Sequence, residues 1–264
     1  MVAFILAGIL GAIIGSFLNA WTYRLEASKS ILAGRSQCPN CNRILGVLEL
    51  IPVYSYLAQR GRCKGCGWKI PFQYIALEII TAGLFVFAVW QNTASGQSAC
   101  FNFFDVCIGV KVWRDFVFLS ALLVIFVFDL KHNLIADTVV LPTAAFAFIW
   151  NFAFGASLYS LLLGVLIPVG FFGAQYLLSR GIWIGEGDIR LGAAIGAMLG
   201  FPLIILALFI SYITGAVAGL AMILMGKANF KSAVPFGVFL ALGTAFSLYY
   251  GEPILRWYFN RLGI

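Results

Sequence analysis

The chain has 264 residues, of which 62% are apolar and only 10% charged, and its mean hydropathy is +0.98. This composition excludes an ordinary soluble domain and predicts an all-α polytopic membrane protein. The net charge of +7 suits anionic membrane lipids, so it does not require a nucleic acid as partner.

Long apolar runs locate the membrane segments, because a helix needs about 20 residues to cross roughly 30 Å of hydrocarbon. The first run lacks the basic start of a signal peptide, so we expect it to remain as a membrane helix. The run 188–200 is rich in Gly and Ala and ends at Gly200-Phe201-Pro202, which leaves seven helices as an alternative to eight. The runs predict about eight transmembrane helices, at residues 2–21, 75–90, 113–130, 138–153, 158–178, 188–200, 202–225 and 234–250.

Basic residues indicate the orientation, because cytoplasmic loops collect Lys and Arg. The loop 22–73 is the most basic polar segment, so we expect it in the cytosol and the N-terminus outside. Under the eight-helix scheme this topology places Asp129 and Asp188 together at the cytosolic face. Four of the 17 basic residues fall on the opposite side, namely Lys111, Arg114, Arg256 and Arg261.

The loop 22–73 contains two CxxC motifs, Cys38-Pro39-Asn40-Cys41 and Cys63-Lys64-Gly65-Cys66. A segment of this size can hardly bury a core of its own, and the spacing is typical of a four-thiolate zinc site. A reducing cytosol disfavours disulfides, and the basic neighbours Arg62 and Lys64 should help to hold thiolates. The alternative is a set of reduced structural or redox cysteines.

A zinc ion held by Cys38, Cys41, Cys63 and Cys66 would have no open position for water, so we predict a structural role. Zinc-bearing basic loops also occur in nucleic-acid-binding proteins. Here the topology already explains the charge, and we predict no nucleic acid. A further pair, Cys100 and Cys107, lies in or beside the predicted external loop 91–112, where a disulfide is possible but not indicated.

Two aspartates stand where apolar runs meet polar residues, and a charge beside a bilayer indicates a function. Asp129 directly follows a run of five apolar residues that begins at Val124. Asp188 follows Gly185 and Gly187, which would let the backbone approach a ligand or adopt unusual dihedral angles. Asp188 also begins a predicted helix, so a simple capping role is an equal alternative for that residue alone.

Together the two aspartates form a candidate acid/base pair. Two carboxyls a few ångströms apart cannot both ionise readily, so one keeps a proton while the other can activate water. The only histidine, His132, has no Ser or Cys partner in an obvious triad motif. This favours hydrolysis by carboxyls over nucleophilic catalysis.

Other acidic residues near the same face have weaker signals. Glu78 lies within the apolar run 75–90 and could reach the interface, pair with Arg24 or bind substrate, of which the structural pairing is the simplest. Asp137 and Glu186 are expected to be solvated loop residues.

An ordered set of motifs along nearly the whole chain resembles the type IV prepilin peptidases, membrane aspartic proteases of the GxGD class. GxGD alone would be weak, but the order and number of the motifs are specific. They are Gly15-Ser16-Phe17-Leu18-Asn19, Tyr23-Arg24-Leu25, the two CxxC motifs, Ile51-Pro52-Val53-Tyr54-Ser55-Tyr56-Leu57, Arg60-Gly61-Arg62-Cys63, Phe128-Asp129-Leu130, Gly185-Glu186-Gly187-Asp188-Ile189-Arg190-Leu191 and Val234-Pro235-Phe236-Gly237.

The resemblance implies that Asp129 and Asp188 are the catalytic aspartates, supported by Gly185 and Gly187, and that the cysteines belong to a zinc-bearing cytosolic domain. It also implies two activities at the inner membrane of a bacterium: removal of the basic leader from prepilins or pseudopilins, then N-methylation with S-adenosylmethionine. No glycine-rich nucleotide motif is present. The methyl-donor site is therefore expected near the cysteine loop without named residues.

This reading divides the chain into a first transmembrane helix (1–21), a zinc-binding loop (22–73) and a membrane-embedded protease domain (74–264). One departure from the family is Ile135-Ala136-Asp137, which lacks the usual proline and should loosen the loop after Asp129. A different GxGD protease, acting on preflagellins or signal peptides, is an alternative that the cysteine loop disfavours. An ion-coupled transporter would need acids nearer the membrane midplane and repeated halves, and neither is seen.

Overall fold

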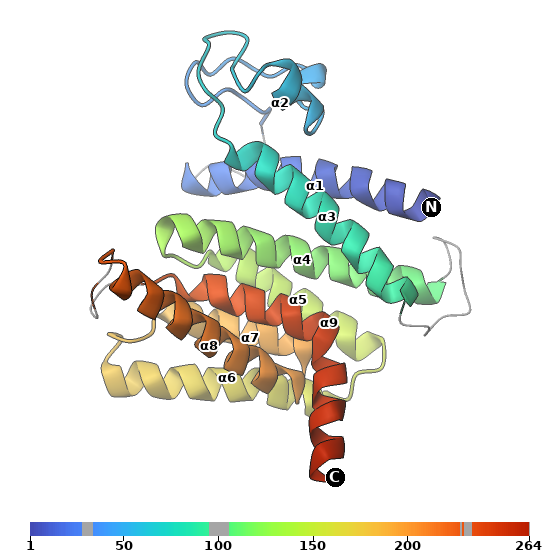
Figure 1. The fold of residues 1–264 in the computed structure, drawn as a ribbon, viewed down its shortest axis with the longest axis vertical. Coiled ribbons are helices and arrows are strands. Elements are labelled where there is room, and N and C mark those ends of the chain that lie inside the picture. Colours follow the sequence, from blue (N-terminus) through green and yellow to red (C-terminus); the bar gives the residue numbers. More distant parts are fainter. Residues whose placement is uncertain (28–33, 95–105, 228, 230–233, 264) are drawn as a thin grey trace. The chain divides into compact units, whose positions relative to one another are not determined.

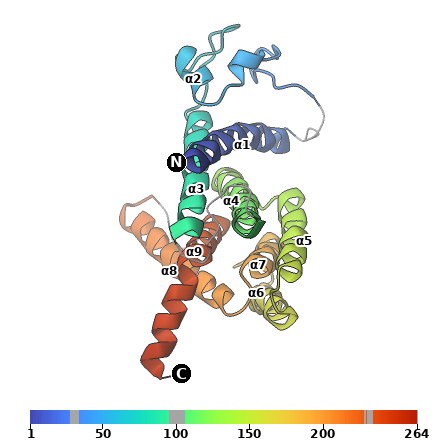
Figure 2. The same ribbon diagram turned by 90° about the vertical axis from the view of Figure 1, so that its right-hand side faces the viewer.

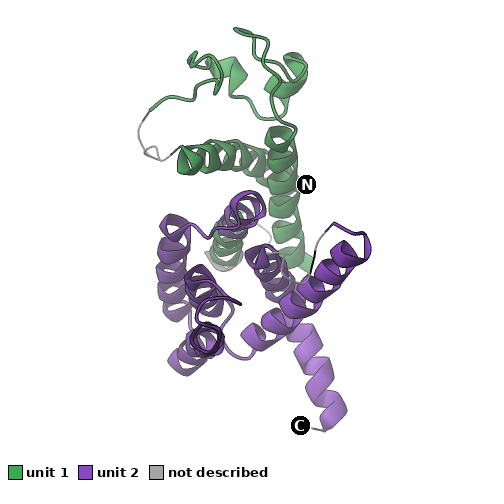
Figure 3. Ribbon diagram, turned by 90° about the vertical axis from the view of Figure 1, so that its left-hand side faces the viewer, with its two compact units in different colours: residues 1–120 green, residues 121–264 purple. Residues whose placement is uncertain are grey.

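The computed structural model of the protein describes residues 1–27, 34–94, 106–227, 229 and 234–263, with the backbone alone for 106–108. Within these residues the chain is helical, and the only β-type pairings are two isolated bridges, Gln37 with Ile44 and Arg62 with Lys69. The chain forms two compact units, Met1–Ser120 and Ala121–Ile264 (Figure 3).

All eight predicted helical segments are present, and several extend beyond the apolar runs that predicted them (Figure 1). The helices at both ends of the chain are longer because polar residues continue them past the hydrophobic stretch. A 3₁₀ turn, η1 (Val47–Glu49), and a short helix, α2 (Tyr54–Ala58), lie in the cysteine loop. The eight long helices are α1 (Val2–Glu26), α3 (Gln73–Ala94), α4 (Val106–His132), α5 (Asp137–Ala153), α6 (Leu158–Ser179), α7 (Glu186–Leu199), α8 (Leu203–Leu224) and α9 (Phe236–Leu262).

Within the described residues, five helices are long and apolar enough to cross a membrane: α1, α3, α6, α8 and α9. The helix α5 is apolar but shorter, and α4 carries five charged residues, Lys111, Arg114, Asp115, Asp129 and Lys131. The all-helical, multi-pass membrane architecture is therefore confirmed, whereas the number of eight crossings stays a prediction.

In the first unit, α1 crosses α3 in close contact (Figure 2), and a Gly-x-x-x-Gly pair of α1 lies at this contact. A Cβ atom at Gly11 would lie 2.7 Å from the Cα atom of Ala82, and one at Gly15 would lie 2.8 Å from the Cα atom of Glu78. Small residues at this spacing let two membrane helices approach closely. The cysteine loop then joins the end of α1 to the start of α3.

In the second unit, α7 is the most enclosed helix and packs against α5, α6 and α9. Its side chains from Leu191 to Leu199 are nearly all buried. The run 188–200, which left the choice between seven and eight helices open, thus forms a separate helix. This helix ends before Gly200, and α8 begins at Leu203. By contrast, α8 exposes a row of apolar side chains suited to lipid, namely Ile205, Phe209, Ile213, Val217 and Leu220.

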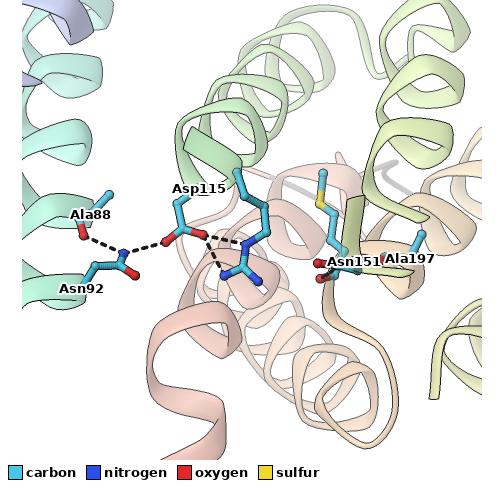
Figure 4. Close-up of polar contacts among 7 residues, drawn as sticks. Ala88, Asn92, Asp115, Asn151 and Ala197 are labelled. Carbon is cyan, nitrogen blue, oxygen red and sulfur yellow. Dashed lines mark hydrogen bonds and ion pairs between the residues drawn. The ribbon is translucent and has the colours of Figure 1, made fainter. Parts of the chain in front are cut away.

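Buried polar side chains hold helices together inside each unit (Figure 4). In the first unit, the Asn92 amide on α3 donates to the Ala88 carbonyl at 2.8 Å and to the Asp115 carboxylate on α4 at 2.9 Å. In the second unit, the Asn151 amide on α5 donates to the Ala197 carbonyl on α7 at 2.8 Å. Such bonds satisfy polar groups that water cannot reach.

Candidate active site and metal centre

The first candidate catalytic residue, Asp129, lies in the last turn of α4 and is only 4% exposed. Its Oδ2 atom accepts a hydrogen bond from the Val238 backbone N–H at 3.0 Å, and the Gly237 N–H also donates to the carboxylate. These N–H groups belong to the first turn of α9, where they have no partner within the helix. The carboxylate of Asp129 therefore caps α9.

The second candidate, Asp188, lies in the first turn of α7 and is half-buried. Its Oδ2 atom accepts the Gly185 backbone N–H at 3.1 Å. The capping role that we considered for Asp188 is thus present. It is compatible with catalysis, because a helix N-terminus favours a negative charge that could serve either purpose.

The bundle brings the two aspartates together. The Asp129 carboxylate lies close enough to Asp188 to act on it electrostatically, although the two residues come from different helices. Both are held at helix N-termini, α9 for Asp129 and α7 for Asp188. Two carboxyls within electrostatic range of each other favour a state with one ionised and one protonated group, which is what acid/base chemistry on water requires.

The glycines beside this pair provide space and not unusual dihedral angles. Gly185 has ordinary extended angles, φ −82° and ψ 162°, so our expectation of special dihedrals at this residue is wrong. At Gly187 a Cβ atom would lie 3.0 Å from the Cβ of Ile135. At Gly237 it would lie 2.9 Å from the Oδ2 atom of Asp129. The missing side chains let the loop after Asp129, and Asp129 itself, pack closely against α7 and α9.

A polar network surrounds the start of α7. Arg190 forms ion pairs with Asp137 at the start of α5 and with Glu186 one turn earlier, the latter at 3.4 Å. The Tyr176 hydroxyl on α6 also donates to Glu186 at 3.0 Å. We had expected Asp137 and Glu186 to be solvated loop residues. Both instead lie at helix starts and are ion-paired. The network ties the ends of α5, α6 and α7 to the loop that follows Asp129.

The second candidate site is the cysteine cluster. The sulfur atoms of Cys38, Cys41, Cys63 and Cys66 all lie within 4.8 Å of one another. Cys38 and Cys63 are buried, whereas Cys41 and Cys66 are exposed. None of these four cysteines forms a disulfide, and four sulfur donors at such distances could hold one metal ion.

The two CxxC motifs fold in the same way. In each, the first cysteine donates its N–H to the carbonyl five residues later, at 2.9 Å to Arg43 and 2.9 Å to Trp68. The carbonyl of each first cysteine accepts the N–H four residues later, from Asn42 and Gly67, and both of these residues have positive φ. Such turns point backbone N–H groups at sulfur.

The surroundings lower the pKa of two thiols, Cys63 and Cys66, but not that of Cys41. At Cys41 the Arg43 N–H lowers the pKa, but desolvation and the other three cysteines raise it to about 11. N–H groups of Cys66 and Gly65 lower the pKa of the Cys63 thiol to about 6. A hydrogen bond from the Asn40 amide lowers the pKa of Cys66. We had expected the basic side chains of Arg62 and Lys64 to lower these pKa values, but the main contributions come from the backbone and from Asn40. Thiolates are the form that binds metal ions.

For the other two cysteines the sequence left a disulfide open, and Cys100 and the side chain of Cys107 lie outside the described residues.

The sequence reasoning missed several residues that position these sites. Val238 and Gly237 hold Asp129, and Asn40 holds Cys66. The signal for the first two was present in the motif Val234-Pro235-Phe236-Gly237, since Pro followed by Gly before an apolar run marks a helix start with room beside it. Which carboxylate would cap that helix could not be read from the sequence.

Fold and sites together define a polytopic helical membrane protein with a pair of aspartates at one end of a helix bundle and a separate four-cysteine cluster. Two family descriptions match this chain. The bacterial peptidase A24 N-terminal domain matches residues 9–92, which contain the cysteines, and the type IV leader peptidase family matches residues 116–220, which contain both aspartates.

Curated relatives agree with these matches, and each carries the name prepilin leader peptidase/N-methyltransferase. The protein of Bacillus subtilis (strain 168) is 34% identical over 253 residues, which are 95% of each chain. The protein of Aeromonas hydrophila is 30% identical over 97% of this chain and 93% of its own. That of Burkholderia pseudomallei (strain 1026b) is 30% identical over 93% and 84%. No solved structure matches the chain.

The chain therefore belongs to the type IV leader peptidase family. The matches span both units and do not favour a transporter or a GxGD protease of another kind.

Proposed function

We propose that the protein is a membrane aspartic endopeptidase that removes the short basic leader from type IV prepilins or pseudopilins and then N-methylates the new N-terminus. The names of the relatives support both activities. The observation that carries the proposal is that the carboxylates of Asp129 and Asp188 each accept backbone N–H groups at a helix start in the second unit, α9 and α7, within electrostatic range of each other.

In the proposed reaction, the ionised carboxylate of the pair takes a proton from water as the water oxygen attacks the scissile carbonyl carbon. The protonated carboxyl gives its proton to the nitrogen of the leaving amine as the C–N bond breaks. Backbone N–H groups of α9 and α7 fix the position of both carboxyls during these transfers. Neither a nucleophilic side chain nor a metal ion is needed for this chemistry.

We further propose that the pair works at the cytosolic face of a bacterial inner membrane, with the N-terminus outside. The excess of Lys and Arg in residues 22–73 supports this orientation. A prepilin with its apolar helix in the lipid and its basic leader in the cytosol would present the scissile bond at that depth. Water reaches the site there without crossing lipid.

For the cysteine cluster we propose a structural zinc ion bound by Cys38, Cys41, Cys63 and Cys66. Support comes from four sulfur donors in two matching turns and from backbone N–H groups that favour a thiolate at Cys63. With four protein ligands the ion would stabilise the 22–73 loop and leave no position for substrate. On this view residues 74–264 carry the peptidase and residues 22–73 support methylation, with S-adenosylmethionine as methyl donor.

The direct test is an assay of the purified full chain, in detergent or lipid nanodiscs, with a prepilin as substrate. Leader loss is measured by mass spectrometry, and methyl incorporation is measured separately from labelled S-adenosylmethionine. We expect both. An intact prepilin after prolonged incubation with folded protein would refute the peptidase assignment, and cleavage without methylation would refute the second activity alone.

A further inference from the structure

A cavity of about 280 Å³ lies in the first unit, between the facing ends of α1 and α3 and the cysteine loop. Its volume falls near the lower end of the range for small-molecule sites. The wall combines aromatic rings and cationic side chains with two carboxylates, Glu78 and Glu49, of which Glu49 is ion-paired with Arg43. The residues that matter for recognition are Arg24 on α1, Arg35, Tyr56 and Trp68 of the loop, and Tyr74 and Glu78 on α3.

Glu78 is the unusual member of this wall, because it is a carboxylate only 6% exposed. Its Oε2 atom accepts the Val53 backbone N–H at 2.7 Å, and the Ser16 hydroxyl also hydrogen-bonds to it. The pairing with Arg24 that seemed simplest from the sequence is not formed. Within the described residues, no cationic side chain pairs with Glu78. A buried carboxylate without a cation is costly unless a ligand supplies the positive charge.

The loop is held in place against Glu78 at some cost to the backbone. Val53 has φ 61°, a conformation that β-branched residues rarely adopt, and its N–H is the group that Glu78 accepts. Strain of this kind is found where the surrounding structure fixes a functional site. The bond keeps η1 and α2 on either side of Val53 against α3, and so shapes the cavity before any ligand enters.

The remaining lining residues fit a ligand that has a cation, an aromatic ring system and a carboxylate. The rings of Tyr56, Trp68 and Tyr74 are half-buried, so they offer faces to a purine base or to a positive sulfur. Arg35 lies on the same cavity and could receive a carboxylate. Arg24, whose guanidinium donates to the Gly34 carbonyl at 2.7 Å, adds a second positive charge to this wall. A phosphate-rich nucleotide would be disfavoured by the buried Glu78.

We propose that this cavity is the binding site for the methyl donor S-adenosylmethionine, with Glu78 facing its positively charged end. This inference rests on the proposed methyltransferase activity and gives that activity a location. When bound, the donor supplies a methyl group on a positively charged sulfur, which becomes a neutral thioether after transfer to an uncharged amine. The chain's own residues bind and orient the donor and shield it from bulk water.

The cysteine cluster forms part of the same cavity, since Cys38 and Cys63 are among its lining residues. These are also the two buried cysteines of the cluster. A metal ion that fixes the four sulfurs would therefore fix one wall of the methyl-donor site. This explains why a peptidase whose aspartates lie in the other unit would keep a metal-binding loop.

The test is equilibrium binding of S-adenosylmethionine and of S-adenosylhomocysteine, which lacks the positive sulfur, to the purified full chain by isothermal titration calorimetry. We expect the Glu78→Gln variant to bind S-adenosylmethionine at least about tenfold more weakly, which corresponds to about 1.4 kcal/mol. The loss for S-adenosylhomocysteine should be smaller. Glutamine can still accept the Val53 N–H, so the variant removes the charge and keeps the loop contact. Trp68→Ala should weaken both ligands.

The matched control is Glu252→Gln, which removes an exposed carboxylate of α9 whose ion-pair partner is Arg256. Its affinity for both ligands should equal that of the native chain. If Glu78→Gln and Trp68→Ala bind S-adenosylmethionine as tightly as the native chain, the donor binds elsewhere and the inference fails. Equal losses for both ligands in Glu78→Gln would refute the role of its charge.

A second measurement does not depend on the folding of any variant. Photo-crosslinking of methyl-labelled S-adenosylmethionine to the native chain should label peptides within residues 34–78, and labelling confined to residues 121–264 would overturn the inference. Leader cleavage is measured in the same preparation. Cleavage and methylation with the label in the wrong unit would reject the cavity alone, whereas cleavage without any donor binding would reject the methyltransferase activity and the cavity together.

Discussion

The cysteine loop and the aspartate pair assemble reactive side chains in opposite ways. In the loop, each CxxC turn is closed by backbone hydrogen bonds between residues at most five positions apart. At the aspartate pair, the hydrogen bond that fixes Asp129 spans 109 positions and joins α4 to α9. The first site is built by local turns, and the second exists only when several helices have packed.

This difference has a physical consequence for how the sites fail. A local turn can form or be lost with its own loop and with a bound metal ion. A pair of carboxyls held by helix ends depends on close helix contacts, such as those at Gly187 and Gly237. We therefore expect the two sites to respond to different substitutions and conditions.

The largest effect should come from removing either carboxyl. Asp129→Asn and Asp188→Asn should each lower leader cleavage by at least about 10³-fold, because each removes half of the acid/base pair. The asparagine oxygen can still accept the Val238 or Gly185 N–H, so the protein should stay folded. Cleavage is measured by gel shift of a prepilin, with thermal unfolding as a check on the fold. Near-native cleavage by either variant would remove that residue from the mechanism.

Changes of pH should act on the aspartate pair in both directions. Cleavage needs one ionised and one protonated carboxyl, so the rate should fall about tenfold per pH unit beyond each limb of a bell-shaped curve. The acidic limb follows protonation of the base, and the alkaline limb follows loss of the acid's proton. Initial rates across the range where the protein stays folded provide the measurement. A rate without an alkaline fall would contradict a shared proton.

Removal of the metal should separate the two regions. Elemental analysis of protein purified without chelator should find one zinc ion per chain, and Cys63→Ser should lose it. This variant, or treatment with a zinc chelator, should reduce methylation by at least about tenfold and affect leader cleavage much less. Cys100→Ser, outside both CxxC motifs, is the matched control. Cleavage abolished by chelation while the fold is intact would indicate a metal-dependent peptidase.

A single methyl group should disturb the aspartate pair through packing alone. In Gly237→Ala the new Cβ would lie 2.9 Å from the Oδ2 atom of Asp129, so the carboxylate must shift. We expect a loss of cleavage of about 10- to 100-fold, because small displacements of catalytic groups are costly. Gly170→Ala on α6 is the control, since its Cβ would meet nothing within 4 Å. Equal activity of both variants would show that Gly237 does not position Asp129.

The smallest effect is expected in the polar network at the start of α7. Arg190 and Asp137 are each 43% exposed at the side chain, and exposed ion pairs contribute about 0–1 kcal/mol. Asp137→Asn and Arg190→Gln should therefore change cleavage by less than about fivefold, in assays parallel to those of the aspartate variants. If Asp137 proves essential and Asp129 dispensable, the assignment of the first catalytic aspartate is wrong.

Much of this protein can be read from its sequence, because its strongest signals are local. Apolar runs predicted the eight long helices, since a lipid environment demands continuous hydrophobic stretches. The two CxxC motifs predicted the sulfur cluster, since each forms a single turn. The ends of the helices were less predictable, as at α9, where the helix continues past the apolar run to Leu262.

The tertiary structure alone decided how the sites are supported. No local pattern reveals that Asp129 caps α9 or that Gly187 makes room for Ile135. Nor does one reveal that Glu78 accepts a hydrogen bond from the Val53 N–H instead of pairing with Arg24. These contacts join residues distant in the sequence, and packing selects them from many chemically equal partners. The sequence by itself indicated which side chains are candidates for the chemistry, because their motifs are local, whereas the packing of the helices determined which contacts those side chains make.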